Sequence, residues 1–308
     1  MADGHDHVSA AVAQHAGAAY KRRLVVAFCL IGGFFLVELV GGLLTNSLAL
    51  LSDAGHMLTD VLGIGMAVAA IHLASTRRDD AQRSFGLYRL EILAALANAV
   101  LLTGLAGYVL YESIRRLVDP PEVLGLPMLV IGALGLVVNL VAFWLLRGGK
   151  DASLNIQGAY LEVLADLIAS VGVVTAAVVV QTTGFTRIDP IFAIGIALFI
   201  VPRAWRLGSR AVRVLVQAAP HDIDLSELRG ELHQVDGVAD VHDLHLWTLT
   251  SGMEVASVHL RLDPGADAHD ALDRTRALLR THYGIEHATV QVEPAEHEGC
   301  DGCGVLDW

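Results

Sequence analysis

The stretch His56-Met57-Leu58-Thr59-Asp60 lies inside a long apolar run from Ser47 to Ala74 and places an imidazole and a carboxylate four residues apart. A second apolar run, from Ser153 to Val180, contains Glu162-Val163-Leu164-Ala165-Asp166 with the same spacing. Residues four apart lie on one face of an α-helix. Ionisable groups at membrane depth are costly, and they usually face a bundle interior on an ion or proton path. The two runs therefore predict a membrane protein with a polar site between two helices.

Facing one another, these side chains would offer three carboxylates and one imidazole. Zinc and similar dications take about four nitrogen or oxygen ligands in tetrahedral geometry. We therefore expect a divalent-metal site formed by His56, Asp60, Glu162 and Asp166. The alternative is that each group pairs with another side chain inside the bundle, and two matched pairs favour the metal. Ligation needs ionised carboxylates and a neutral imidazole, so metal and protons compete, and a proton–metal exchanger follows.

The composition also indicates a membrane protein, because 18% of the 308 residues are charged, against about 25% in soluble domains. A membrane-spanning helix needs roughly 20 mostly apolar residues. Six such helices are predicted, at about 24–44, 48–74, 88–113, 125–146, 153–180 and 188–206. The sixth has the shortest apolar core. We expect an all-α six-helix transmembrane bundle over residues 24–210.

Basic residues set the orientation, because lysine and arginine accumulate in cytoplasmic segments of membrane proteins. The outside loops would hold Arg115, Arg116 and Arg187. The cytoplasmic side would hold thirteen basic residues, namely Lys21, Arg22, Arg23, Arg77, Arg78, Arg83, Arg89, Arg147, Lys150, Arg203, Arg206, Arg210 and Arg213. Both termini are therefore expected in the cytoplasm. These residues border apolar runs and form no exposed stripe, so no nucleic-acid partner is expected.

The two halves of the apolar region share a weak echo at an offset of 106 residues, which aligns Asp60 with Asp166. An inverted repeat of three plus three helices would give this echo and would place the site near the bilayer midplane, although chance identity is the alternative. Other polar residues have simpler expectations. Glu38, Glu91 and Asn139 are expected to make interhelical hydrogen bonds, and Asp53 is expected to cap its helix.

After Arg203 the sequence has the periodicity of a soluble protein. Asp224 is a plausible N-cap of a helix, and Ser251-Gly252 is a hairpin signal between two strands. Helices are expected at 224–234 and 267–282, and strands at 241–249, 255–262 and 287–292. This α-β-β-α-β order predicts a small cytosolic, ferredoxin-like α+β domain over residues 211–293. Residues 1–23 would form a His-bearing N-terminal tail, and residues 294–308 a Cys-containing C-terminal tail.

Three stretches resemble the cation diffusion facilitator family: Ser47–Asp60 (SLALLSDAGHMLTD), Phe85–Asn98 (FGLYRLEILAALAN) and Val241–Gly252 (VHDLHLWTLTSG). The resemblance covers about residues 20–293. It implies a homodimeric, proton-coupled antiporter in a lipid membrane that exports zinc or related divalent ions from the cytoplasm by alternating access, and not an enzyme. Zn²⁺ would be a transported substrate and a regulatory ligand, not a tightly bound cofactor. The family's transport site carries over to the four residues of the two helix pairs.

Glu162 departs from the zinc-selective pattern, in which this position is histidine. The run Asn155–Val163 (NIQGAYLEV) instead resembles the bacterial cobalt–zinc–cadmium resistance branch, which implies a bacterial plasma membrane. A carboxylate in place of an imidazole makes the site harder and more negative. We therefore expect zinc to bind, with looser discrimination against Co²⁺ or Cd²⁺.

Family members also bind regulatory metal at the interface of paired tail domains. The matching positions are His242, His259 and Glu293, with His287 as a further candidate, and Gln291 stands where some members have histidine. This favours a single site over a binuclear one, and the alternative is a set of core or solvated histidines. Separately, Cys300 and Cys303 have the spacing of a zinc-ligand pair, but two thiolates alone do not complete a site.

Two other functions deserve comparison with an exporter. A membrane metalloenzyme would typically need a His-Glu-x-x-His motif, and none occurs in the chain. A metal sensor or passive channel would show no stoichiometric proton movement, which separates it from an exchanger. No Walker-type nucleotide loop occurs either, so ATP is not expected to drive transport.

Overall fold

The computed structural model describes residues 26–27, 29–76, 85–147 and 154–296. The chain divides into two compact units. The first unit combines residues up to 65 with residues 97–206, and the second combines residues 66–96 with the chain from residue 207 onward. Helices build the first unit, whereas the sheet belongs to the second. The predicted N-terminal tail at 1–23 lies outside the described residues, and so does the predicted C-terminal tail at 294–308 apart from residues 294–296.

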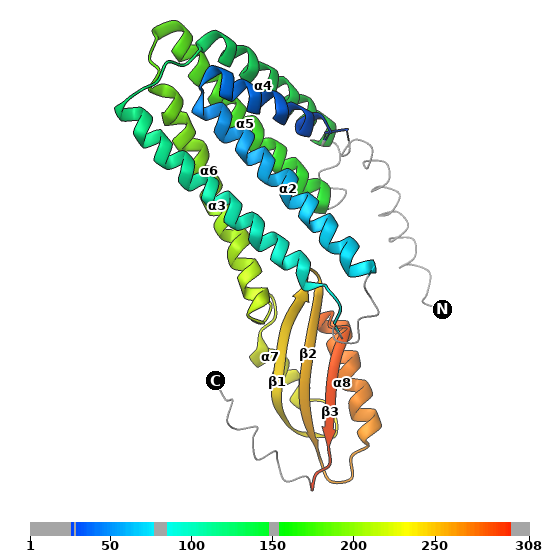
Figure 1. Cartoon of the computed structure of the whole chain (residues 1–308). Helices are drawn as coiled ribbons and strands as arrows, with labels where there is room; N and C mark the ends of the chain where they lie inside the picture. The colour runs from blue at the N-terminus through cyan, green and yellow to red at the C-terminus, as the bar shows by residue number, and fades with distance from the viewer. Residues whose placement is uncertain (1–25, 28, 77–84, 148–153, 297–308) are drawn as a thin grey trace. The chain divides into compact units, whose positions relative to one another are not determined.

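Long helices run side by side in the first unit (Figure 1). An apolar helix over Cys29–Thr45 is followed by α2 Leu48–Thr76, α3 Arg89–Val118, α4 Gly125–Arg147, α5 Leu154–Thr183 and α6 Ile188–Leu215. Within the described part of the chain, four of these helices are long and apolar enough to cross a membrane: α3, α4, α5 from Tyr160, and α6. The chain is thus a multi-pass membrane protein, and the count of six spans stays a prediction.

The sixth helix differs most from its expected range, because α6 continues to Leu215 instead of ending near residue 206. The expected end followed the loss of apolar residues. Arginine is a good helix former, however, and a helix can continue as an amphipathic one after its apolar core ends. Pro202 lies inside α6 and does not end it. Arg203 therefore lies in the middle of a long helix and not at its terminus.

Large apolar side chains cover the surface of the helical unit, and small or polar residues fill its interior. Trp205, Leu44 and Trp144 are 76%, 73% and 70% exposed. By contrast, Ala49, Ala106 and Ala177 are buried, as are Asp53 and Asp189. Large exposed apolar surfaces mark contact with a non-aqueous partner, and small residues let membrane helices approach closely. This distribution suits lipid around the helices.

The N-terminus of α2 is capped by α6. The buried Asp189 accepts a hydrogen bond from Ser47 Oγ at 2.6 Å and another from Leu48 N at 2.7 Å. The first amides of a helix lack intrahelical partners, and negative charge is favoured there. The expectation that Asp53 caps this helix was wrong, because α2 begins before it and Asp53 lies buried along the helix.

A hydrogen bond between α4 and α5 confirms the expectation for Asn139. Its Nδ2 donates to Ser170 Oγ at 2.8 Å, and both side chains are buried. Glu91, in the first turn of α3, has a different kind of partner from the one expected. It accepts hydrogen bonds from Thr250 Oγ1 at 2.7 Å and Ser251 Oγ at 2.9 Å, which belong to the hairpin of the sheet in the same unit.

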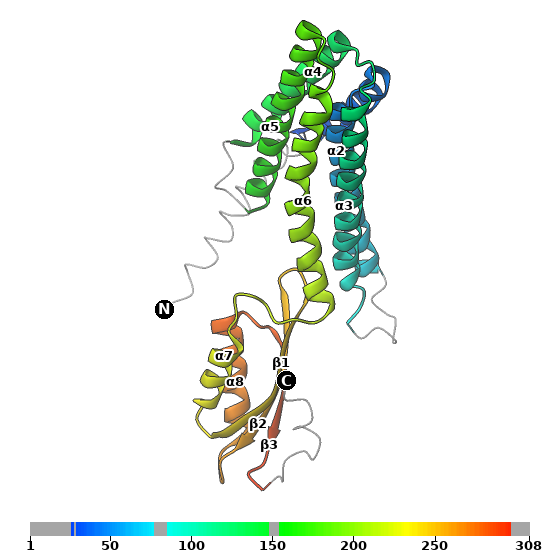
Figure 2. The ribbon, with the colours of Figure 1, turned by 90° about the vertical axis from the view of Figure 1, so that its left-hand side faces the viewer.

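The second unit contains the predicted α-β-β-α-β order: α7 Leu225–His233, β1 Val238–Thr250, β2 Met253–Leu262, α8 Ala268–Tyr283 and β3 His287–Glu293. The strand order is β1-β2-β3, with β1 antiparallel and β3 parallel to β2. Helices α7 and α8 cover one face of the sheet (Figure 2). Leu228, Leu232 and Leu279 bury their side chains fully between the two layers. The ferredoxin-like classification itself stays a prediction.

Local signals explain these boundaries. Asp224 Oδ1 accepts a 2.7 Å hydrogen bond from Ser226 N and caps α7, as expected. Asp267 caps α8 in the same way. The β1–β2 turn uses Gly252 with a positive φ of 72°, a conformation that costs glycine little. The turn at Gly252 joins β1 to β2 in the antiparallel register that pairs His242 with His259.

Candidate metal centres

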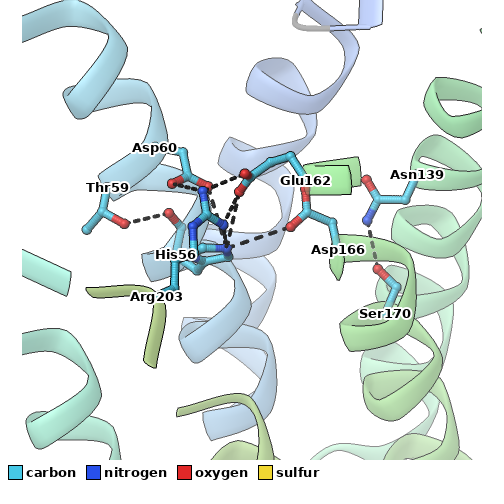
Figure 3. A network of polar contacts seen from close by, with 8 residues as sticks. All are labelled: His56, Thr59, Asp60, Asn139, Glu162, Asp166, Ser170 and Arg203. Carbon is cyan, nitrogen blue, oxygen red and sulfur yellow. Dashed lines mark hydrogen bonds and ion pairs between the residues drawn. The ribbon is translucent and has the colours of Figure 1, made fainter. Parts of the chain in front are cut away.

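The predicted quartet comes together in the helical unit (Figure 3). Helix α2 supplies His56 and Asp60, and helix α5 supplies Glu162 and Asp166. Nε2 of His56 lies 3.5 Å from Asp60 Oδ2, 3.8 Å from Glu162 Oε1 and 3.8 Å from Asp166 Oδ1. The i, i+4 spacing on each helix therefore turns all three carboxylates toward one imidazole.

These distances suit a dication. Ligands about 2.0–2.1 Å from a tetrahedral zinc ion are roughly 3.3 Å from one another, slightly less than the separations seen here. One ligand atom each from His56, Asp60 and Glu162 lies within 4.8 Å of the others. Asp166 joins through His56 and stands outside this tightest group. The structure therefore brings three candidate ligands within 4.8 Å of one another, with Asp166 next to His56.

Burial differs across the quartet. His56 and Asp166 are 5% and 4% exposed, whereas the side chains of Asp60 and Glu162 are 23% and 31% exposed. Among the described residues, Asp166 Oδ1 has no hydrogen-bond partner. Buried polar atoms are rarely left unpaired without a functional reason. The site is thus reachable from one side and has an uncommitted carboxylate oxygen on its buried side.

The structure adds Arg203 of α6, which was expected among the cytoplasmic basic residues. Its Nη2 donates to Glu162 Oε2 at 2.5 Å, and its Nη1 forms an ion pair with Glu162 Oε1. Nη1 also lies 3.3 Å from His56 Nε2, and Nη2 lies 3.6 Å from Asp60 Oδ1. The guanidinium occupies the centre of the cluster in Figure 3. The sequence could have indicated this role only if α6 had been predicted to continue to Leu215, which places Arg203 inside the helix.

Two further acids are buried in the helical unit, Glu38 and Asp53, each 1% exposed. In the described part of the chain, both carboxylate oxygens of Asp53 and Oε2 of Glu38 lack hydrogen-bond partners. Glu38 was expected to bond to a neighbouring helix. The structure shows no hydrogen-bond partner for Glu38 Oε2 among the described residues, so that expectation stays a prediction.

A second cluster lies on the sheet of the other unit. His242 on β1 and His259 on β2 are register partners, and Glu293 ends β3. Glu293 is 3% exposed, and its oxygens lie 3.3 Å from His242 Nε2 and 3.2 Å from His259 Nδ1. One ligand atom from each of the three lies within 4.8 Å of the others. The predicted tail ligands are therefore brought together, and metal ligation by them stays a prediction.

Two neighbours of this trio were not predicted as ligands. Asp243 has a positive φ of 50° at an irregularity in β1, and its Oδ2 lies 3.5 Å from His259 Nε2. Gln291 Nε2 donates to Glu293 Oε1 at 2.8 Å and lies 3.4 Å from His259 Nδ1. The bulge turns Asp243 toward the trio, which regular strand alternation would not predict.

His287, the further candidate ligand of the tail domain, is not in this cluster. His287 pairs in register with Val255, four residues before His259, which separates it by about 13 Å along the strand. Its ring packs edge-on against Phe85 with centroids 5.6 Å apart. The structure therefore places His287 away from the trio. Cys300 and Cys303 lie outside the described residues.

Long apolar helices around a polar cluster, together with a small α+β domain, define the class as multi-pass membrane proteins with an appended α+β domain. The comparisons agree. The cation efflux transmembrane domain matches residues 24–216, and the cation efflux protein cytoplasmic domain matches residues 220–295. The chain belongs to the cation efflux family, which confirms the expected cation diffusion facilitator membership, and this family consists of transporters, not enzymes.

Similar proteins carry consistent names. The metal cation efflux system protein CzcD of Cupriavidus metallidurans is 42% identical over 302 residues, covering 98% of this chain and 93% of the relative. The zinc transporter ZitB of Escherichia coli is 40% identical over 305 residues, covering 98% and 95%. A cadmium, cobalt and zinc/H(+)-K(+) antiporter of Bacillus subtilis is 37% identical over 287 residues, covering 92% of each chain. These relatives are named as metal-cation or zinc transporters, in agreement with the family that the chain belongs to.

Proposed function

We propose that this protein is a proton-coupled antiporter that exports Zn²⁺, and also Co²⁺ or Cd²⁺, from the cytoplasm by alternating access. The observation that carries the proposal is the meeting of the two i, i+4 pairs around His56 Nε2, with carboxylate oxygens at 3.5–3.8 Å. A relative named as an H(+)-K(+) antiporter of cadmium, cobalt and zinc supports exchange against another cation.

Competition for the same atoms supplies the coupling. A dication binds when the three carboxylates are ionised and His56 is neutral, and protons on those groups weaken its hold. Protons entering from the outer side would therefore favour release there. The partial exposure of Asp60 and Glu162 gives the ion a route to His56 and Asp166, which lie deeper.

The topology and assembly that belong to this proposal are six spans, both termini in the cytoplasm, a plasma-membrane location and a homodimer. The match to a domain described as the cytoplasmic domain of cation efflux proteins supports a cytoplasmic tail. The cluster of His242, His259 and Glu293 is proposed as a regulatory metal site of that tail. We propose domain limits of 24–210 for the transport domain and 211–293 for the cytosolic domain.

Proteoliposomes with a pH-sensitive dye inside test this proposal, with Zn²⁺, Co²⁺, Cd²⁺ and Mn²⁺ offered in turn. Metal movement should be accompanied by proton movement in the opposite direction, in a fixed ratio. Asp60→Ala and Asp166→Ala should each abolish both fluxes. Metal flux without proton flux would instead indicate a channel, and unchanged transport in both variants would exclude the quartet as the site.

A further inference from the structure

The quartet contains a cation of its own, the guanidinium of Arg203. We infer that Arg203 is an internal competitor of the transported metal: it binds Glu162 and Asp60 when the metal does not, and it sets how tightly the metal is held. This inference rests on the proposed function, because it concerns the affinity and release of the transported ion at the same site.

Geometry makes the two cations mutually exclusive. Nη2 of Arg203 donates to Glu162 Oε2 and Nη1 forms an ion pair with Glu162 Oε1, so the planar fork of the guanidinium faces both oxygens of this carboxylate. A metal ligated by the same carboxylate and by His56 Nε2 would sit about 2 Å from each ligand atom. Nη1 lies only 3.3 Å from that imidazole nitrogen. The guanidinium must therefore leave Glu162 and His56 before a dication reaches ligand distance.

Charge makes the competition consequential. Arginine does not lose its proton in proteins, so Arg203 is a permanent positive charge beside three carboxylates. Its side chain is 33% exposed, and this opening gives the guanidinium a place to move when it is displaced. Buried ions need partners, and Arg203 supplies one for Glu162. Without it, the carboxylates would hold a dication more tightly and release it more slowly.

The competing explanation is that Arg203 only holds α6 against α2 and α5. The two explanations predict opposite changes in metal affinity. Loss of a purely structural ion pair would disorder the ligands and weaken metal binding. Loss of a competitor would strengthen metal binding while slowing turnover, so affinity and rate would move in opposite directions.

The test measures Zn²⁺ affinity of the full chain in nanodiscs by competition with a fluorescent zinc chelator. His242→Ala and His259→Ala are included throughout to remove the candidate tail site, and the membrane component is the binding lost on Asp60→Ala. Arg203→Gln should bind zinc about tenfold tighter or more, within the usual range of coupling between ligands. It should also export zinc severalfold more slowly in proteoliposomes. Arg203→Lys keeps the charge without the planar guanidinium, so its zinc affinity and export rate should lie between those of the parent and of Arg203→Gln.

Arg206→Gln is the matched control, because Arg206 follows one turn later on α6, is exposed and donates to Pro202 O at 3.3 Å. Its zinc affinity should equal that of the parent. An Arg203→Gln affinity equal to or weaker than the parent would overturn the inference and leave the proposed function standing. Absence of any Asp60-dependent zinc binding or transport in the parent would overturn both, and the parent protein alone reports that outcome.

A second measurement needs no variant and so survives a folding failure of Arg203→Gln. Phenylglyoxal modifies accessible guanidinium groups, and mass spectrometry reports the extent at each arginine. Zinc should raise labelling of Arg203 severalfold in the unmodified protein, because the metal displaces the side chain from Glu162, while labelling of Arg206 stays constant. Unchanged or lower labelling of Arg203 in saturating zinc would contradict displacement.

Discussion

Ser47 Oγ donates a 2.6 Å hydrogen bond to Asp189, although the two residues are 142 positions apart. The same carboxylate accepts from the amides of Leu48 and Ala49. The first turn of α2 is thereby tied to the first turn of α6. Because α2 carries His56 and α6 carries Arg203, these hydrogen bonds set how far along the bundle axis the two side chains lie relative to one another.

Asp189→Asn should lower stability. The amide keeps the shape of the side chain but loses the charge favoured at a helix N-terminus, and its NH₂ group faces donors. The expected cost is about 1–3 kcal/mol, the range for a buried polar group left poorly paired. Thermal unfolding of the detergent-solubilised protein measures it. Asp119→Asn, at an exposed acid, is the control, and equal unfolding temperatures for both variants would contradict the capping role.

Glu162→His should narrow the range of transported metals. An imidazole in place of the carboxylate softens the site and lowers its negative charge, which favours Zn²⁺ over harder ions. The ratio of Zn²⁺ to Co²⁺ transport should rise about tenfold, equivalent to ~1.4 kcal/mol. Uptake into vesicles measures this ratio, with Glu162→Asp as the control that keeps a carboxylate. A ratio unchanged by Glu162→His would show that this position does not determine selectivity.

Zinc binding at the sheet cluster should weaken as the pH falls, because the metal needs neutral imidazoles and protons displace it. In an Asp60→Ala background, His259→Ala should remove this binding. His269→Ala should not, because His269 is 84% exposed and its ion-pair partner is Asp273 on its own helix. Isothermal titration of the full chain at several pH values provides the measurement. If zinc binding did not change with pH, or if His269→Ala removed it, the site would lie elsewhere.

Gln291→His should strengthen the same site. Gln291 is the register partner of His259 and already lies 3.4 Å from its Nδ1, so a histidine there would add a fourth ligand to His242, His259 and Glu293. An additional nitrogen ligand should raise zinc affinity by about tenfold or more. Thr289→His, two residues earlier on β3, controls for an added histidine. An affinity no higher than the parent's would argue against ligation by this trio.

Periodicity and spacing were sufficient to predict most of the fold. The helices α2 to α5 and the strands β1 to β3 lie within a few residues of the expected ranges. These elements could be predicted because their limits depend on local signals: an apolar run forms the element, and nearby proline or glycine residues end it. The end of α6 was predicted too early. Hydropathy falls after Pro202, although the helix continues there as an amphipathic one.

The candidate site divides in the same way. His56 and Asp60, and Glu162 and Asp166, were predicted because each pair lies on one helix, where spacing alone places side chains on a face. Arg203 was assigned to the cytoplasm, since its approach to Glu162 depends on how α6 packs on α5. Asp189 was not predicted as a cap for the same reason. Asp243 joins the tail cluster through a backbone irregularity that strand alternation does not reveal.

Glu91 draws together two parts of the second unit that the sequence separates widely. In the hairpin between β1 and β2, Thr250 and Ser251 donate hydrogen bonds to Glu91 in the first turn of α3. The same two strands carry His242 and His259 further along their length. If an ion bound by His242 and His259 shifts these strands, the shift would reach Glu91 through the hairpin, and the first turn of α3 would then report whether the sheet cluster is occupied.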